Sequence, residues 1–280
     1  MSEIDPFKIR ALVPDFEAIS AGYAAASQAM RDTARHQLDI QYGEGARERL
    51  DLFFPARSDG PAPIHLFIHG GYWRANDKEN FAFPAKTIVE AGAIAAIVEY
   101  TLMPGARMAQ LVSETRRAAA WLVAHAPEFG GDATRLSASG HSAGAHLASY
   151  LAAKGPHEHQ FPAAPPRALL LISGIYDLRP ITSSFLQPEL QLTAGEVAEW
   201  SPFEAEQARG TEIVLVVGHN ETEPFHLQAQ DLAFAAGRRG APIERITAPG
   251  HDHMTIARDL GIPGTQMAEL LVECIERSKR

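Results

Sequence analysis

The chain has 280 residues, of which 46% are hydrophobic and 21% are charged. This composition supplies enough apolar material for a packed core, so it excludes an intrinsically disordered chain. Its 25 Lys and Arg residues against 34 Asp and Glu residues give a formal net charge of −9. Because no overall positive field would attract a phosphate backbone, we expect no nucleic-acid partner.

The sequence carries no sign of a disulfide, a membrane span or a secretion signal. Its single cysteine, Cys274, lies in the stretch LLVECIERSKR without a partner in the chain, and we expect it on the apolar face of a last helix. No stretch approaches the roughly 20 apolar residues that cross a bilayer. The first residues, MSEIDPFKIR, are too polar for a signal peptide. We expect a cytoplasmic protein without membrane contact, and a homodimer is compatible with this composition.

Short apolar runs alternate with stretches of helical periodicity, which is typical of an α/β sheet. A Gly-Glu-Gly turn separates the first two runs, so we expect them to form an antiparallel hairpin. Strands are predicted at 36–43, 47–54, 64–70, 93–100, 134–140, 167–174, 212–218 and 241–248. Helices are predicted at 76–91, 108–125, 143–153 and 225–239 and from Thr265, with a looser helical region at 188–200. The expected fold is a mostly parallel sheet of about eight strands flanked by helices.

No internal repeat or low-complexity tract divides the chain, so we expect a single domain over residues 1–280. The Ala-rich stretch DFEAISAGYAAASQAMRDTA near the start predicts a helix outside the sheet. We expect residues 1–35 to form a helical cap segment. The Pro- and His-rich stretch 154–167 predicts a loop whose paired histidines, His157 and His159, face solvent.

Residues 140–144, Gly-His-Ser-Ala-Gly, match the pattern G-x-S-x-G. A predicted strand precedes the motif and a predicted helix follows it, which is the setting that a nucleophile elbow requires. In such a turn the serine is strained and its hydroxyl is lifted clear of the sheet, while the helix N-terminus favours a developing negative charge. The pattern predicts Ser142 as a nucleophile, and an ordinary Gly/Ser turn is the alternative.

The segment His-Gly-Gly-Tyr-Trp directly follows the predicted strand IHLFI. Consecutive glycines let the backbone approach a ligand closely and direct N–H groups toward it. We expect the N–H groups of Gly70 and Gly71 to form one half of an oxyanion hole, which the N–H of Ala143 completes. Tyr72 and Trp73 either pack in the core or form a wall of the substrate pocket.

A nucleophilic serine needs a base and an orienting carboxylate, which follow the serine in such a sheet in the order acid, then histidine. Two strand-end loops in the last third of the chain supply both. The first loop offers Glu221 and Glu223, and the second offers His251 and His253. Spacing alone does not choose within either pair. The pair of histidines also raises the hypothesis of a zinc site. No third and fourth ligands have suitable spacing, so we expect no metal.

These motifs resemble those of the arylformamidase (kynurenine formamidase) branch of the α/β-hydrolase superfamily, near the hormone-sensitive-lipase-like esterases. The Tyr-Trp pair after the two glycines is similar to that branch's signature. VEYTLMP at 98–104, SGIYDLRPI at 173–181 and VGHNETEPFHLQ at 217–228 resemble it further. With GHSAG and GHDHM, the resemblance spans about residues 64 to 256, whereas the first 35 residues are not diagnostic.

The resemblance implies an α/β-hydrolase fold and a choice within both ambiguous pairs. In this branch the acid is the carboxylate four positions before the Phe of the Phe-His-x-Gln motif, which is Glu221 in this sequence. The family more often has Asp there, and Glu is longer by one methylene. The branch's catalytic histidine immediately precedes a hydrophobic residue, which implies His253.

The activity that the resemblance implies is hydrolysis of a small aryl formamide, such as N-formylkynurenine, through an acyl-enzyme. Ser142 would attack the carbonyl, His253 would act as general base, and Glu221 would orient the imidazole. No cofactor is implied. A carboxylesterase acting on small acyl or aryl esters is the alternative, because the same triad serves both reactions. A non-catalytic binding protein of this fold is a third possibility, which the intact serine, histidine and glycine loop disfavour.

The last prediction concerns the residues that contact the substrate. The aryl amine is expected to rest against aromatic side chains such as Tyr72, Trp73 or Tyr176. His141, which precedes the serine, is also expected among the substrate contacts.

Overall fold

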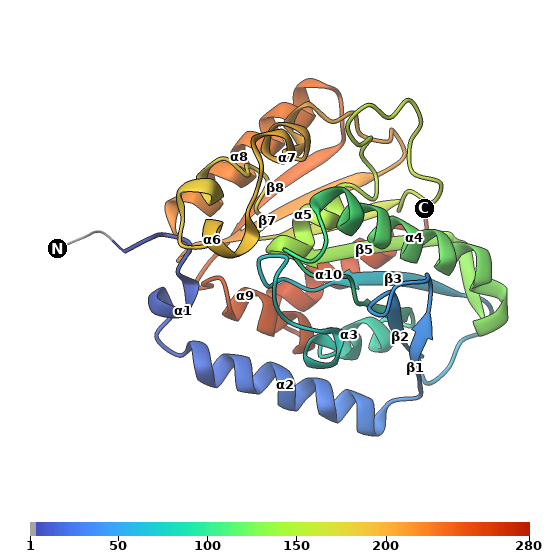
Figure 1. The fold of residues 1–280 in the computed structure, drawn as a ribbon. Helices are drawn as coiled ribbons and strands as arrows, with labels where there is room; N and C mark the ends of the chain where they lie inside the picture. The colour runs from blue at the N-terminus through green and yellow to red at the C-terminus, as the bar shows by residue number, and fades with distance from the viewer. Residues whose placement is uncertain (1–3) are drawn as a thin grey trace.

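An eight-stranded sheet forms the middle layer of the structure, a computed structural model that describes residues 4–280 (Figure 1). The strand order is β1-β2-β4-β3-β5-β6-β7-β8. β2 pairs antiparallel with β1 and with β4, and the neighbouring pairs from β4 to β8 are parallel. The strands are β1 (His36–Gln41), β2 (Arg49–Phe53), β3 (Ala62–Ile68), β4 (Ile94–Val98), β5 (Gly131–His141), β6 (Ala168–Ile172), β7 (Glu212–Gly218) and β8 (Ile243–Ala248). The prediction of a mostly parallel sheet that starts with an antiparallel hairpin is confirmed.

The central strands are buried on both faces, which explains their continuous apolar runs. Every residue of β3, β4 and β6 is buried. His65 is the polar residue among the apolar ones of β3. Its ring nitrogens bond the hydroxyls of Ser137 and Ser139 in β5 at 2.8 and 2.7 Å. Burial lowers the pKa of His65 to about 3. The ring is therefore neutral and cross-links the two strands that lead into the glycine motifs.

Helices cover both faces of the sheet (Figure 1). One face carries α4 (Met108–His125), α5 (Ala143–Ser149) and α8 (Glu223–Arg238), and the other carries α3 (Ala85–Glu90) and α10 (Gln266–Arg277). The other helical segments are α1 (Ile9–Leu12), α2 (Phe16–Thr33), η1 (Lys78–Phe81), η2 (Ala126–Phe129), η3 (Pro180–Ser183), α6 (Gln187–Leu190), α7 (Ala194–Glu199), η4 (Pro202–Glu204), α9 (Thr255–Arg258) and η5 (Asp259–Gly261). Over residues 4–280, no helix combines the length and the apolar character needed to cross a bilayer.

The apolar face of α10 packs against the sheet and buries the single cysteine. Cys274 is 2% exposed, and its Sγ lies 3.8 Å from the Ala138 carbonyl oxygen of β5. Burial raises the pKa of the Cys274 thiol to about 12. The expectation that this residue lies on the apolar face of a last helix is confirmed.

The predicted helix at 76–91 is wrong as a continuous element, because the structure divides it into η1 and α3. The Asp77 side chain caps η1 by accepting the Asn80 N–H at 2.9 Å. Pro84 directly precedes α3 and, lacking an N–H, cannot continue a helix from the segment before it. The four-residue helix α9 is too short to give a periodic signal and was missed. Residues 154–167 form a loop, as predicted.

The predicted N-terminal helix is α2, which lies along the outside of the molecule away from the sheet (Figure 1). The Tyr23 hydroxyl donates a hydrogen bond to the Met254 carbonyl, and the Ser27 hydroxyl accepts the Phe83 N–H at 3.1 Å. These buried bonds attach α2 to segments far along the chain. Of the segment expected to form a cap, residues 1–3 lie outside the described residues.

A buried group of charges joins α2 to the first strands and to η1. Asp51 in β2 is fully buried and pairs with Arg31 of α2 and, at 3.0 Å, with the Lys78 ammonium. Lys78 also pairs with Asp39 of β1 at 2.7 Å, and the Asp39 N–H donates to Asp51 at 2.8 Å. Each buried charge therefore has an opposite charge and hydrogen-bond donors or acceptors.

Replacing Asp51 with Ala should lower the free energy of unfolding by about 1 to 3 kcal/mol, because Arg31 and the Asp39 N–H would lose their buried acceptor while Lys78 keeps Asp39 and Glu79 as partners. Urea denaturation followed by circular dichroism measures the change. Asp59→Ala, in an exposed loop, is the matched control and should leave the stability unchanged. Equal stability of the Asp51 variant and the wild type would contradict this account.

Candidate active site

The predicted nucleophile lies in a strained turn between β5 and α5. Ser142 has φ 57° and ψ −121°, a backbone conformation that a non-glycine residue rarely adopts. The flanking glycines make the turn possible. A Cβ on Gly140 would lie 2.2 Å from the Gly144 carbonyl oxygen, and a Cβ on Gly144 would lie 2.1 Å from the Ile68 carbonyl oxygen of β3. The turn therefore packs backbone against backbone.

A buried carboxylate and an imidazole meet above the neighbouring strand ends. Glu221 follows β7 and His253 follows β8. The Glu221 Oε2 atom accepts a hydrogen bond from His253 Nδ1 at 2.7 Å. Its Oε1 atom accepts the Gly218 N–H at 2.6 Å and the Ser173 hydroxyl at 2.5 Å. The Glu221 side chain is fully buried, so these three donors fix its orientation.

The structure separates the members of both ambiguous pairs. Glu223 is the first residue of α8 and is exposed, away from the imidazole that Glu221 contacts. His251 bonds the Pro249 carbonyl at 2.9 Å and Asp259 at 3.1 Å, so both of its ring nitrogens are engaged outside the site. Glu221 and His253 are the members that lie together, and they are the pair that the resemblance implied.

Three backbone N–H groups lie in the two glycine motifs that meet at the nucleophile. Over the described part of the chain, the N–H groups of Gly70, Gly71 and Ala143 donate no hydrogen bond. A Cβ on Gly70 would lie 3.1 Å from Ser142 Cβ, so this loop touches the nucleophile. Gly71 has φ 120°, and a Cβ there would lie 2.3 Å from the Ala75 carbonyl oxygen. The loop therefore needs both glycines.

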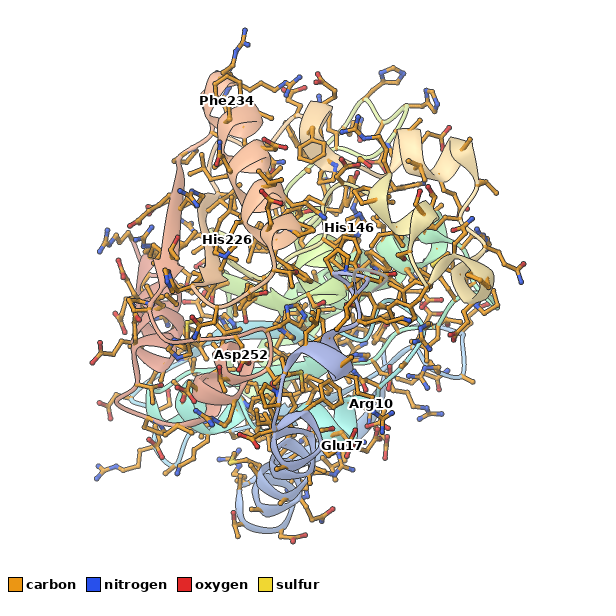
Figure 2. All side chains as sticks on the ribbon, turned by 90° about the vertical axis from the view of Figure 1, so that its left-hand side faces the viewer. Arg10, Glu17, His146, His226, Phe234 and Asp252 are labelled. Carbon is orange, nitrogen blue, oxygen red and sulfur yellow. The ribbon has the colours of Figure 1, made fainter. Side chains whose placement is uncertain are left out.

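These groups line one cavity of about 900 Å³. Ser142, His253 and the glycine loop contribute to its wall, and α1, α2 and the two residues before α1 cover it. Figure 2 looks onto that cover and labels Arg10 and Glu17, two largely exposed residues that also line the cavity. The aromatic residues that line the cavity are Phe7, Phe16, Tyr23, Tyr72, Phe81 and Phe185. The cavity therefore places the motif residues beside an aromatic wall, half of which comes from the N-terminal segment.

Two of the four predicted substrate contacts lie in this cavity. Tyr72 lines it and donates its hydroxyl to the Phe7 carbonyl at 2.6 Å, which fixes the N-terminal segment over the site. His141 also lines it, with its Nε2 donating to the His253 carbonyl at 2.9 Å. Burial, followed by the nearby His253, lowers the pKa of His141 well below its ordinary value. His141 is therefore a neutral ring that supports the loop carrying His253.

The other two predicted contacts lie in the core, and placing Trp73 and Tyr176 in the pocket was wrong. Trp73 is fully buried, with its ring 5.3 Å from the His146 ring in an edge-to-face arrangement. Tyr72 and Trp73 have φ of 50° and 58°, so the chain turns sharply and sends neighbouring side chains in different directions. Tyr176 is fully buried over Gly174, where a Cβ would lie 2.3 Å from the Tyr176 hydroxyl oxygen.

Sequence reasoning missed the residues that hold the site in place. Ser173 directly follows β6, and its hydroxyl donates to Glu221. A polar residue at the carboxyl end of a buried strand was the sequence feature that could have identified it. Phe7 and Phe185 gave no signal, because their place in the cavity depends on tertiary packing. Among residues 4–280, no group of three or more His, Cys, Asp or Glu side chains could hold a metal ion.

The BD-FAE family matches residues 50–177. A kynurenine formamidase of Salmo salar is 29% identical over 255 residues, covering 89% of this chain and 85% of that protein. A carboxylic ester hydrolase candidate of Mycobacterium tuberculosis is 37% identical over 135 residues, covering 47% of this chain and 31% of that protein. The solved structure of a candidate thioesterase from a Silicibacter species superposes with TM-score 0.82 at 26% identity, covering 95% of this chain and 97% of that one.

Replacing Gly144 with Ala should lower the free energy of unfolding by about 1 to 3 kcal/mol, because the new Cβ would collide with the β3 backbone. Chemical denaturation measures the loss. Gly195→Ala in α7 is the control, since a Cβ there meets no atom closer than 3.9 Å. If both alanine variants were as stable as the wild type, the close contact between the turn and β3 would be refuted.

Proposed function

The chain belongs to the α/β-hydrolase superfamily, and on that premise we propose that it is a serine hydrolase that works through an acyl-enzyme. The observation that carries this proposal is the hydrogen-bonded pair of His253 and Glu221 in the cavity that holds Ser142. A nucleophile in a strained turn, a base and a buried acid are the parts that this chemistry needs.

The reaction begins when Ser142 attacks the substrate carbonyl and His253 takes its proton. The Nδ1–H of His253 is directed at Glu221, which leaves Nε2 as the basic nitrogen for the serine. Over residues 4–280 no hydrogen bond yet joins Ser142 to His253, and such bonds often tighten only when substrate is bound. Glu221 stabilises the imidazolium that forms.

The tetrahedral intermediate places negative charge on the former carbonyl oxygen. The N–H groups of Gly70, Gly71 and Ala143 would receive that oxygen, since they have no other acceptor in the described residues. Ala143 is the first residue of α5, so the positive end of the helix dipole adds to this stabilisation. His253 then returns the proton to the leaving group, and water hydrolyses the acyl-enzyme.

The proposed substrate is a small aryl formamide of the N-formylkynurenine kind. The relative from Salmo salar, a kynurenine formamidase, supports this because it aligns over 85% of its own length. The aromatic wall of Phe16, Tyr72 and Phe185 suits an aryl leaving group, which stacks on such rings. A formyl group needs little space, so most of the 900 Å³ cavity is left for the amine.

A carboxylesterase is the second candidate function. The Mycobacterium tuberculosis relative is an ester hydrolase candidate with the higher identity of 37%, although over 47% of this chain. The same nucleophile, base and acid hydrolyse esters, and pocket changes alone separate the two substrate classes.

Ser142→Ala should abolish hydrolysis of N-formylkynurenine and of short-chain p-nitrophenyl esters, with the mutant folded as the wild type. The wild type should cleave the formamide with kcat/KM of about 10⁴ M⁻¹s⁻¹ or more. Ser113→Ala on the exposed side of α4 is the control and should keep full activity. Ester turnover with a negligible formamide rate would favour the esterase, and unchanged activity of Ser142→Ala would refute the mechanism.

Glu221→Gln should lower kcat by about 10⁴-fold, because the imidazole would lose the partner that sets its tautomer and stabilises its charge. Glu223→Gln should leave kcat and KM near the wild-type values, since that carboxylate is exposed. Steady-state kinetics of the two variants measure this difference directly. Equal losses in both variants would contradict the assignment of the acid.

A further inference from the structure

The charged side chains that line the cavity are mostly cations. Three of them, Lys8, Arg10 and Arg74, are basic, and Glu17 is the single acidic residue among the described residues that line it. This excess of positive charge contrasts with the formal net charge of −9 of the whole chain. The reaction proposed above assigns no role to any of the three cations.

The two arginines have carboxylate partners within the protein. Arg10 Nε lies 2.6 Å from Glu17, and Arg74 Nη1 lies 2.6 Å from Glu189 of α6. The Arg74 Nε atom is buried and has no hydrogen-bond partner within residues 4–280. Glu189 therefore satisfies only part of the Arg74 guanidinium, which has five N–H donors.

Lys8 differs from the two arginines, because over the described residues 4–280 its ammonium forms no ion pair. The nearest acidic residue along the described chain is Asp5, whose two carboxylate oxygens accept the N–H groups of Phe7 and Phe185 at 2.9 and 2.7 Å. The Lys8 ammonium lies 5.8 Å from the centre of the Phe185 ring, which lines the cavity. A positively charged donor is therefore available beside the aromatic wall.

The rings of this wall determine which part of a substrate meets the ammonium. Phe185 and Tyr72 pack edge to face with their ring centres 6.2 Å apart. An aryl group that stacks on these rings lies beside Lys8, and Arg74 adds a second positive charge to the same cavity. The acyl part of the proposed substrate is only a formyl group, so the group that meets Lys8 belongs to the amine.

An ammonium group selects for negative charge in its ligand. It has three N–H donors and no acceptor, and its hydrogen bonds to a carboxylate are stronger than those to a neutral acceptor. One ammonium without a counter-ion balances a single negative charge, which is the charge of one carboxylate. Loss of this group from the substrate would leave the Lys8 charge unpaired inside the occupied cavity.

We propose that Lys8 is a specificity-determining residue: it binds a carboxylate on the amine part of the substrate, so that the enzyme prefers acidic aryl formamides to neutral ones. The proposal rests on the proposed function, because it names the substrate class of the same site. The contact is remote from the reacting atoms and is present both before and during the reaction. Its loss should therefore raise KM and leave kcat nearly unchanged.

A matched pair of substrates tests this preference. N-formylkynurenine and its α-carboxamide share the formamide and the aryl ring and differ only in the carboxylate. The wild type should have the higher kcat/KM for the acid. Lys8→Gln should lower the ratio of kcat/KM for the acid to kcat/KM for the amide by about 10-fold, mainly through the KM of the acid. Lys8→Arg keeps the charge and should retain most of the preference.

Lys86→Gln is the control for the change in net charge. Lys86 is an exposed lysine of α3 that does not line the cavity, so its replacement should leave the ratio at the wild-type value. The ratio compares two substrates on one protein, so a general disturbance of the cover by the substitution cancels. A Lys8→Gln ratio equal to that of the wild type would overturn the proposal, as would a wild type that prefers the amide.

A second pair of substrates separates this proposal from the proposed function. The aryl ester 3-(4-acetoxyphenyl)propanoate and its amide again differ only in a carboxylate on the leaving group. If the formamides are not cleaved but the esters are, the formamide assignment fails, and the ratio for the ester pair decides the role of Lys8 in the same way. If the formamides are cleaved without any preference for the acid, the hydrolase stands and the role of Lys8 is refuted. A wild type that cleaves none of the four compounds would overturn both proposals.

Discussion

The close contact between two backbones at the end of β5 is the constraint on which the site depends. The turn at Ser142 holds a non-glycine residue at positive φ, a conformation that costs about 1 to 3 kcal/mol. The surrounding structure imposes it, because α5 starts directly against β3 with no side chain between them. The same contact brings the glycine loop after β3 to the nucleophile. One packing arrangement therefore sets the position of the hydroxyl and of the groups that stabilise the developing charge.

The charged groups of the site are placed by hydrogen bonds from several strand ends. Glu221 receives donors from the residue after β6, from the last residue of β7 and from the loop after β8, so no single loop determines its position. Glu99 at the end of β4 is held in a similar way by donors from three segments. A buried carboxylate with all its acceptor positions filled is rigid, and rigid dipoles need no rearrangement when charge develops during the reaction.

Most of the fold and the main chemical motifs could be predicted from the sequence. Continuous apolar strands and the two glycine motifs are local features, so the central strands and the place of Ser142 followed directly. The choice between Glu221 and Glu223 could not be made from spacing, because it depends on how the turn after β7 directs each side chain toward His253, 32 residues further along the chain. Trp73 was misplaced for a similar reason, since two positive φ values reverse the direction of its side chain. The Ala-rich stretch predicted a helical cap segment, but the position of α1 and α2 over the cavity depends on tertiary contacts such as the one between Tyr23 and Met254, which leave no local signal.

The burial of Cys274 has a practical consequence for studying the N-terminal cover. Thiol reagents attack the thiolate, and a thiol with a pKa of about 12 inside the core presents almost none. Since this is the chain's single cysteine, the native protein is silent toward maleimide labels. A cysteine introduced at the exposed Arg10 would then carry a fluorophore or spin label at one defined place, with no background to remove. The protein is thus suited to site-specific spectroscopy of the N-terminal cover.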